Sequence, residues 1–431
     1  MGGRAAIGGP LSADRRRTDA LRPVRSRRGR LMSPRRRVLF VAEAVSLAHV
    51  ARPVVLASGL AAHHEVSVAS APAFDLCFRG TDLRRLGLES IPAKLFLDRL
   101  AAGAPLYTRT ELERYVEADV ALLQRERPDV VIGDFRLSLS VSARLVGIPY
   151  FALCNAHWSP WSAHSRFPLP DITLTRVLGP ALAEPIFRLA QPLAFRLHAG
   201  PLNAVRRKHG LSGFPDVRHA YTDGDLTLYA DTPGLVPVRP DCPPNHHFIG
   251  PIIWSPSMPL PDWWTSMPSG PLAYVTLGST GRVDLLPEVF RALADMQVNA
   301  MTATAGRSDV ASPGPHCFVA DYLPGLEAAA RADFVICNGG SATVYQALST
   351  GTPVIGLCSN MDQFLTMSRV VDAGAGISLR AGNVSYEQLR TALRRMVGGE
   401  AADFRRGAEA VQQDFASFNT RAILNRLVAS A

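Results

Sequence analysis

The residue types best suited to chemistry gather in one glycine-rich segment, which follows the apolar run 333–337. The segment opens a helical pattern and reads, in order, Asn338, Gly339, Gly340, Ser341, Ala342 and Thr343. Glycine lets a backbone approach a ligand closely, and the free N–H groups and dipole of a helix start attract phosphate. A simpler interpretation is a Gly-Gly turn in which Ser341 caps the helix. The segment therefore predicts either a phosphate-binding helix start or an ordinary turn.

The elements that must position this segment alternate along the chain. Apolar, strand-like runs occur at 38–42, 65–69, 130–132 and 150–153, and again at 272–277, 299–303, 317–320, 333–337 and 353–357. Helical patterns, such as those at 52–62 and 140–145, separate the runs. This alternation predicts an α/β fold of two doubly wound, Rossmann-like domains with parallel sheets. Ligands of such sheets bind in the cleft outside the carboxyl ends of the strands.

Composition suggests where the domains begin and end. Residues 233–271 hold eleven of the 33 prolines and three of the five tryptophans, which is typical of an interdomain linker. We therefore expect α/β domains over 36–232 and 272–400, and a C-terminal helix over 401–431.

Most of the positive charge lies before the first strand-like run. Residues 1–31 contain nine arginines and two aspartates, a net charge of +7, so the other 400 residues carry only +2 of the total of +9. We expect residues 1–35 to be a disordered basic tail, or the result of a start assigned upstream of Met32. The charge of the remaining chain does not favour a nucleic-acid-binding protein. The absence of a long apolar window predicts no transmembrane segment, and six scattered cysteines favour the cytoplasm.

The glycine-rich segment belongs to a longer pattern. Tyr322-Leu-Pro-Gly precedes it, and Gln346-Ala-Leu, Gly351, Pro353 and Asp362-Gln363 follow it. This pattern resembles the signature of the family-one nucleotide-sugar-dependent glycosyltransferases, the plant and bacterial natural-product group with the GT-B fold. In that family W-x-P-Q is followed by H-G-G-x-G-T-x-x-E-A-L-x-x-G-x-P and then by D-Q. The resemblance extends over most of residues 36–430 and is weakest over 154–270.

The resemblance implies a metal-independent, inverting hexosyltransferase. It would move a sugar from a UDP- or dTDP-sugar, bound by the C-terminal domain, to a hydroxyl of a small apolar or aromatic acceptor in the N-terminal domain, without a further cofactor. His49, in Leu-Ala-His-Val-Ala-Arg-Pro, matches the family's general base, and Asp134, ending Val-Val-Ile-Gly-Asp, matches the carboxylate that orients it. The implied donor-binding residues are Ser279, Thr280, Tyr322, Asn338, Gly339, Gly340, Ser341, Ala342, Thr343, Gln346, Asp362 and Gln363.

Several positions of the longer pattern depart from the family signature. Asn338 replaces a histidine that donates to the diphosphate, and an amide can donate a hydrogen bond but carries no positive charge. Gln346 replaces a glutamate that accepts from both ribose hydroxyls, and its single acceptor oxygen suits a nucleotide without the 2′-hydroxyl. Tyr322 replaces a tryptophan that stacks on the base, and Gly325 replaces a glutamine. These changes make dTDP-sugars as plausible as UDP-sugars.

Several other features have more than one interpretation. Trp158 and Trp161 could line an aromatic acceptor site or simply pack locally. Asp223-Gly-Asp225 has the spacing of a metal-binding motif but precedes a strand-like run, and we interpret it as a polar turn. His246-His247 lacks further ligands at suitable spacing, so no metal is expected. Two alternatives stay open: transfer to a lipid or cell-envelope precursor, and a non-catalytic, glycosyltransferase-like partner protein. The oligomeric state is not predicted.

Overall fold

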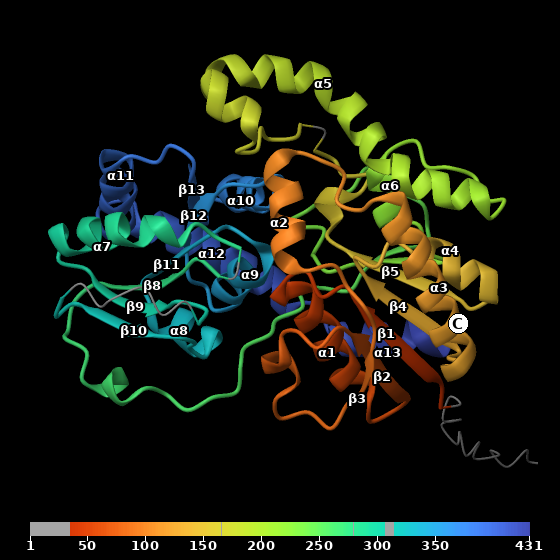
Figure 1. The fold of residues 1–431 in the computed structure, drawn as a ribbon. Helices are drawn as coiled ribbons and strands as arrows, with labels where there is room; N and C mark the ends of the chain where they lie inside the picture. The colour runs from red at the N-terminus through yellow and green to blue at the C-terminus, as the bar shows by residue number, and fades with distance from the viewer. Residues whose placement is uncertain (1–34, 165, 279, 307–313) are drawn as a thin grey trace, which may run out of the picture. The chain divides into compact units, whose positions relative to one another are not determined.

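Two parallel β-sheets organise the residues that this computed structural model describes, which are 35–164, 166–278, 280–306 and 314–431 (Figure 1). The first sheet has the order β3-β2-β1-β4-β5-β6-β7 and the second the order β10-β9-β8-β11-β12-β13. The strands of the first are β1 (Arg37–Ala42), β2 (Glu65–Ser70), β3 (Arg84–Gly87), β4 (Val130–Asp134), β5 (Tyr150–Cys154), β6 (Leu226–Tyr229) and β7 (His246–Phe248). Those of the second are β8 (Leu272–Thr276), β9 (Asn299–Ala303), β10 (Cys317–Ala320), β11 (Phe334–Cys337), β12 (Val354–Cys358) and β13 (Gly376–Arg380). Both orders are those of a doubly wound fold, which confirms the predicted fold class.

Helices connect the strands and cover both faces of each sheet (Figure 1). The first half of the chain, which holds the first sheet, contains α1 (Leu47–Leu60), α2 (Ala93–Ala102), α3 (Arg109–Glu126), α4 (Leu139–Val146), α5 (Thr173–Lys208) and α6 (Val217–Tyr221). The second contains α7 (Leu286–Asp295), α8 (Gly325–Arg331), α9 (Ser341–Ser349), α10 (Met361–Asp372), α11 (Tyr386–Val397), α12 (Ala401–Ala416) and α13 (Thr420–Ala429). Four short 3₁₀ turns occur at Asp75–Phe78, Ala156–Trp158, Asp262–Thr265 and Val283–Leu285 among the described residues.

Strand β1 shows why the first sheet needs helices on both sides. Val38, Phe40 and Ala42 enter one apolar core, whereas Leu39 and Val41 enter the core on the opposite face. Successive side chains of a strand point to opposite faces, so a continuous apolar run is stable only when both faces are covered. This burial explains why a parallel sheet could be predicted from the apolar runs alone.

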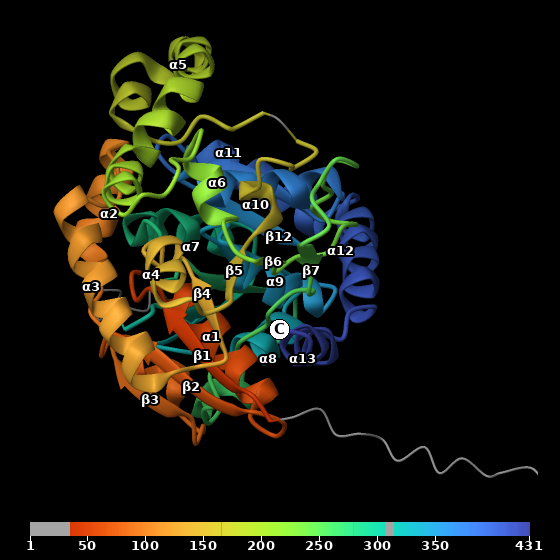
Figure 2. The ribbon, with the colours of Figure 1, turned by 90° about the vertical axis from the view of Figure 1, so that its right-hand side faces the viewer.

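The structure differs from three of the expected boundaries, and a fourth lies outside the described residues. The first helix begins at Leu47 rather than near residue 52, because Val50 and Ala51 already pack on the sheet. The predicted linker contains β7, which pairs in parallel with β6 and extends the first sheet. The expected C-terminal helix is two helices, and the second of them, α13, lies beside α1 (Figure 2) because Leu424 and Leu427 join the core of the first sheet. The predicted basic tail lies outside the described residues except for Arg35.

The strand order places a reversal point in each sheet next to its first strand. In the first sheet the chain leaves β1 for α1 and later returns to β4 on the other side of β1, where Ala42 pairs with Asp134. In the second sheet β8 and β11 have the same relationship, and the residue that follows β11 is Asn338. Doubly wound sheets bind ligands at such points because neighbouring connections diverge there. The predicted catalytic and phosphate-binding segments therefore both lie at reversal points.

Candidate active site

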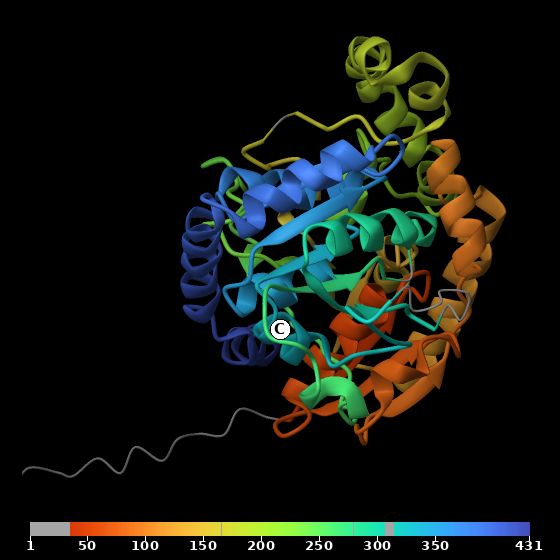
Figure 3. The ribbon, with the colours of Figure 1, turned by 90° about the vertical axis from the view of Figure 1, so that its left-hand side faces the viewer.

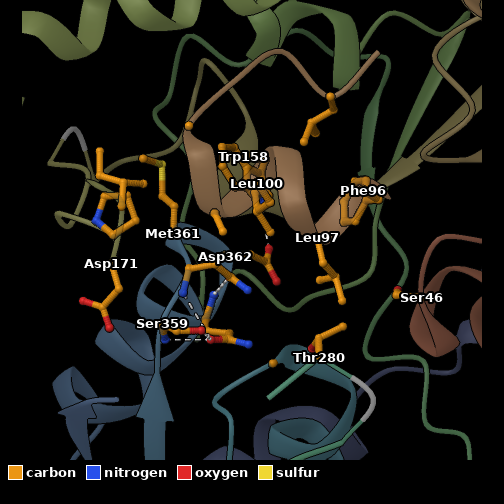
Figure 4. Close-up of a pocket in the computed structure, with 18 of the residues that line it drawn as sticks. Ser46, Phe96, Leu97, Leu100, Trp158, Asp171, Thr280, Ser359, Met361 and Asp362 are labelled. Atoms are coloured by element: carbon orange, nitrogen blue, oxygen red, sulfur yellow. Dashed lines mark hydrogen bonds between the residues drawn. The ribbon is translucent and has the colours of Figure 1, made fainter. Parts of the chain in front are cut away.

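A cavity of about 1130 Å³ joins the two reversal points. His49, Arg52 and Asp134 line it from the first half, and the second half contributes Thr280, Asn338, Gly340, Ser341, Ala342, Thr343, Asp362 and Gln363. Figure 4 shows Phe96, Leu97 and Leu100 of α2 facing Thr280 and Asp362 across this space. The structure thus brings together, around one cavity, most of the site residues that the sequence predicted.

His49 and Asp134 form a direct hydrogen bond inside this cavity. The His49 Nδ1 atom lies 2.8 Å from Asp134 Oδ1, although the two residues are 85 positions apart. A carboxylate accepts, so the geometry assigns the proton to Nδ1, where it donates to Asp134, and Nε2 remains the basic nitrogen. Asp134 is fully buried, whereas about a fifth of the His49 side chain, 21%, is exposed. A buried carboxylate behind a partly accessible imidazole is the arrangement required of a general base and its orienting group.

The ring of Phe135 packs against the imidazole of His49. The two rings stack with centroids 4.7 Å apart and an interplanar angle of 15°. Phe135 adopts a left-handed backbone conformation, with φ of 59°, which is uncommon for a bulky side chain. Backbone strain of this kind costs on the order of 1–3 kcal/mol and gathers at functional sites. The sequence offered no signal for this residue, because its role depends on the conformation that follows β4.

Arg52 is the main site residue that the sequence prediction missed. It lies three residues after His49, so both side chains share one face of α1. Its guanidinium binds Asp134 through two bonds, Nε to Oδ2 at 2.8 Å and Nη2 to Oδ1 at 2.6 Å, and Nη1 donates to Asn155 at 2.7 Å. Burial raises the pKa of Asp134, but Arg52 and His49 outweigh it and hold that pKa below its usual value. The spacing His-x-x-Arg within one helix is the signal that could have identified Arg52.

A chain of buried hydrogen bonds continues from Arg52 to helix α9. Asn155 Nδ2 donates to Asp231 Oδ1 at 2.9 Å, and the backbone N–H of Ala156 donates to Asp231 Oδ2. The hydroxyl of Tyr345, on α9, donates to the same Asp231. Asp231 has no exposed surface, so its carboxylate needs these donors. The chain of bonds couples the His49–Asp134 pair to the helix that starts with the glycine-rich segment.

The first turn of α9 faces the cavity without a side-chain cap. Its N-cap residue is Gly340, which has no side chain, and no side chain of the described residues accepts from the N–H groups of the first turn, which Ser341 begins. A Cβ atom on Gly339 would lie 2.6 Å from Cys358 Sγ, and φ at Gly339 is 79°, so both space and conformation require glycine. An uncapped helix start has positive potential and free donors, which suits a diphosphate. Gly339 itself does not line the cavity.

Asn338 connects the turn after β8 with the turn after β11. Its Nδ2 atom donates to Thr280 Oγ1 at 2.9 Å, and its Oδ1 atom accepts from the N–H of Gly340 at 3.1 Å. The turn after β8 is thereby fixed to the turn after β11. Ser279, the predicted residue next to Thr280 in the turn after β8, lies outside the described residues.

Asp362 lies at the start of α10 and is held by residues of the first half. Trp158 Nε1 donates to Asp362 Oδ1 at 2.7 Å, and His157 Nε2 lies 3.2 Å from the same oxygen. Although burial raises it, these contacts lower the pKa of Asp362 to about 2, so the group is ionised at neutral pH. His157, adjacent to the predicted Trp158, is a second contact that the sequence did not reveal. Gln363 belongs to the capping box of α10: its Oε1 atom accepts from the N–H of the N-cap residue Asn360 at 3.3 Å, and Asn360 Oδ1 accepts from the N–H of Gln363 at 3.1 Å.

Three other predicted residues do not line this cavity. Gln346 is buried and its Nε2 atom donates to the carbonyl of Trp254. Tyr322 is 37% exposed and its hydroxyl donates to the carbonyl of Ala305 at 3.2 Å. Trp161 packs edge-on against His246 in the first half, with ring centroids 4.8 Å apart, which is the local packing that the sequence left open.

Gly325 departs from the family pattern because of the neighbouring glutamine. A Cβ atom at this position would lie 2.6 Å from Gln346 Oε1. A larger residue would therefore displace the Gln346 carboxamide.

The carboxylates of Asp223 and Asp225 form ion pairs or hydrogen bonds with residues of the first half. Asp223 pairs with Arg144 at 2.8 Å and with Arg206 at 3.0 Å. Asp225 accepts from the N–H of Tyr150 at 2.8 Å and thereby fixes the start of β5. Both carboxylates have cationic or N–H partners, which is consistent with the predicted polar turn.

Comparisons with known proteins identify the family of this chain. A family model described as "Erythromycin biosynthesis protein CIII-like, C-terminal domain" matches residues 287–429. The chain is 47% identical over 391 residues to a PGL/p-HBAD biosynthesis glycosyltransferase of Mycobacterium tuberculosis (strain ATCC 25177 / H37Ra), covering 89% of this chain and 90% of the relative. It is 46% identical over 388 residues to a PGL/p-HBAD biosynthesis rhamnosyltransferase of Mycobacterium bovis (strain BCG / Pasteur 1173P2), covering 89% of this chain and 85% of the relative.

A solved structure extends the likeness to the whole fold. Spinosyn rhamnosyltransferase SpnG complexed with thymidine diphosphate matches with a TM-score of 0.62 and 21% identity, over 91% of this chain and 99% of that chain. The matches to the relatives span nearly the full length of both proteins, and the two sheets have the strand orders of paired Rossmann-like domains. The chain is an enzyme and belongs to the family-one glycosyltransferases of GT-B fold.

Proposed function

We propose that this glycosyltransferase moves a sugar from a nucleoside diphosphate sugar to a hydroxyl of a largely apolar, lipid-like acceptor, with His49 as the general base. The observation that carries this proposal is the shared cavity, in which the His49–Asp134 pair and the uncapped start of α9 line the same space. The His49–Asp134 pair can take a proton, and the start of α9 can receive a diphosphate. The transfer needs both functions in one place.

In the proposed reaction the acceptor hydroxyl attacks the anomeric carbon while His49 Nε2 takes its proton. A bond forms between the acceptor oxygen and the anomeric carbon, and the bond from that carbon to the diphosphate oxygen breaks on the opposite face, which inverts the configuration. Asp134 stabilises the imidazolium that results. The N–H groups of residues 341–343, with Thr280, receive the charge of the departing diphosphate. Asp362 binds sugar hydroxyls with the carboxylate oxygens that remain available.

The acceptor side of the cavity is apolar, which supports a lipid-like acceptor. Phe96, Leu97 and Leu100 line it from α2, and Phe187 and Phe195 line it from α5. Such a lining binds a ligand chiefly by burying its apolar surface. The relatives are named for PGL/p-HBAD biosynthesis, which favours the cell-envelope alternative over a small natural-product acceptor. One of them is named a rhamnosyltransferase, so a rhamnosyl donor is the first sugar to test.

The test of this function is transfer in vitro. The full chain is mixed with dTDP-rhamnose or UDP-glucose and with a phenol that carries a long alkyl chain, and products are identified by mass spectrometry. The expected result is a glycosylated phenol together with free nucleoside diphosphate. Alkyl phenols and short, polar phenols are compared at equal concentration. A product with the polar phenols alone would contradict the lipid-like acceptor, and release of diphosphate without any glycoside would contradict the transfer.

The donor nucleotide is expected to be dTDP rather than UDP. Gln346 is buried and does not line the cavity in this structure, so we expect it to contact the ribose only once the donor is bound. Its Nε2 atom donates to the carbonyl of Trp254, and its oxygen is its acceptor. A second ribose hydroxyl would gain no bond from this side chain and would lose its hydration on binding. We expect a Kd for dTDP about tenfold lower than that for UDP, which corresponds to about 1.4 kcal/mol.

Thermal shift with each nucleotide measures this difference, since a ligand of the folded state raises the melting temperature in proportion to its binding free energy. Thymidine is the control, because it lacks the diphosphate that the α9 start is expected to bind. A larger shift with UDP than with dTDP would contradict the prediction.

A further inference from the structure

Helix α5 exposes a row of large apolar side chains to solvent. Leu182, Ile186, Leu189, Leu193 and Leu197, here called the apolar stripe, are 46–87% exposed. At about 100° of rotation per residue, these positions fall within about 80° of one side of the helix. Figure 3 shows α5 standing clear of both sheets, next to α2.

The exposed apolar surface of the described residues is concentrated on this helix. Of the eleven exposed large hydrophobic residues, seven belong to α5, because Val177 and Leu178 join the five of the apolar stripe. Single exposed leucines are ordinary, but a contiguous patch marks a surface that binds a partner or a membrane.

The charges on α5 favour an anionic partner. Arg188 and Arg196 are exposed on the same helix as the stripe, and Glu184 is the single acidic residue within Thr173–Lys208. Glu184 is itself paired with Arg188 at 2.9 Å, so the helix presents apolar and positively charged side chains to solvent. This combination is typical of helices that lie in the interface of an anionic bilayer.

The other side of α5 lines the candidate active site, so the stripe is continuous with the acceptor side of the cavity. Phe187, Ala190 and Ala194 face the cavity. Ala190 lies four residues after Ile186 and three before Leu193, which places it beside the stripe on the helix surface. An apolar acceptor that leaves a bilayer beneath the stripe would therefore meet apolar side chains on its way to His49.

The backbone of α5 favours a position on a membrane rather than across it. The helix is broken at Gly179, where φ is 72° and ψ is 160°, and it contains four prolines. Among the helices of the described residues, none is long and apolar enough to cross a bilayer.

We infer that the apolar stripe of α5 docks on the surface of an anionic lipid bilayer and places the acceptor side of the cavity next to the lipid. The inference rests on the proposed function, because it takes the acceptor to be lipid-like. Insertion of the leucines would bury apolar surface, and Arg196 would approach lipid phosphates. A second copy of the chain or another protein could also cover the stripe, and the experiment below separates these outcomes.

The test is co-sedimentation of the full chain with vesicles of phosphatidylcholine and phosphatidylglycerol in equal parts. The variant L189E/L193E carries two negative charges in the centre of the stripe. The control L145E/L260E changes two exposed leucines outside α5, which are 45% and 47% exposed. We expect the wild type and the control to bind, and the stripe variant to bind at least tenfold more weakly. Binding should also weaken when salt is added or when phosphatidylglycerol is left out. Equal melting temperatures for all three proteins would show that the variants are folded.

Each other outcome contradicts the inference. If the wild type does not sediment with these vesicles, the inference is wrong. This holds if light scattering shows a monomer, and also if it shows a dimer that L189E/L193E dissociates. Equal vesicle binding by the stripe variant overturns it as well. Vesicle binding is measured without donor or acceptor, so docking that is observed without any sugar transfer would support the inference and contradict the proposed function.

Discussion

Replacing His49 by alanine is expected to lower kcat by about 10²–10⁴-fold, the range that a general base contributes. The imidazole lies 2.8 Å from a fully buried carboxylate and retains an accessible nitrogen on the cavity side. The substitution removes the group that takes the acceptor proton but leaves the start of α9 and Asn338 in place. Binding of dTDP, measured by thermal shift, should therefore stay close to that of the wild type.

His63→Ala is the matched control, because His63 is an exposed histidine beyond the end of α1. It should keep wild-type turnover. If His49→Ala kept wild-type turnover as well, His49 would not be the base. A loss of dTDP binding along with turnover would instead show that the substitution disturbs the donor site.

Replacing Arg52 by methionine is expected to lower the free energy of unfolding by about 3–5 kcal/mol, the cost of leaving one charge of a buried pair without its partner. Asp134 has no exposed surface, and Arg52 contributes two of its hydrogen bonds. Urea unfolding at neutral pH measures the loss. Arg395→Met is the matched control, since it breaks an exposed pair with Glu400 and should cost less than about 1 kcal/mol.

The loss caused by Arg52→Met should shrink as the pH falls. In the wild type the pKa of Asp134 is held below its usual value, so its contribution to stability is present above the unfolded pKa and is lost as pH falls through the folded pKa. Without Arg52 the effect of burial prevails and raises that pKa. The folded variant then binds a proton that the unfolded chain releases, and it gains stability relative to the wild type on acidification. The double variant R52M/D134N removes both charges and should be more stable than Arg52→Met alone. A loss that does not change with pH would contradict the pairing.

The fold could be predicted because its signals are local. Most strands are four to six residues long and rich in buried apolar side chains, and the turn after β11 carries glycines where the backbone requires them, as the φ of 79° at Gly339 shows. Strand β7 was missed because it has only three residues and lies among prolines. Its pairing with β6 stabilises it, and that pairing leaves no mark in the residue pattern.

The candidate site could be predicted only in part, because it depends on contacts between distant residues. The family pattern pointed to His49 and Asp134, but their contact exists because parallel pairing sets Ala42 of β1 beside Asp134 of β4. The family pattern does not include Arg52, and only its spacing of three residues from His49 on α1 hints at a shared site. Its role follows from a carboxylate 82 residues away that would otherwise be buried without a counter-charge.

The sequence by itself determined the two doubly wound sheets, the glycine-rich start of α9 and the chemistry of its residues, because strand burial, helix starts and left-handed turns depend on neighbours along the chain. Only the tertiary structure decided which charges meet and which apolar faces stay uncovered. The leucines of α5 repeat at the spacing of a buried helix, and packing alone shows that one side of that helix lines the cavity while the other is left in solvent. Burial is a property of the assembled molecule, so a residue pattern can show that a surface is apolar but not what covers it.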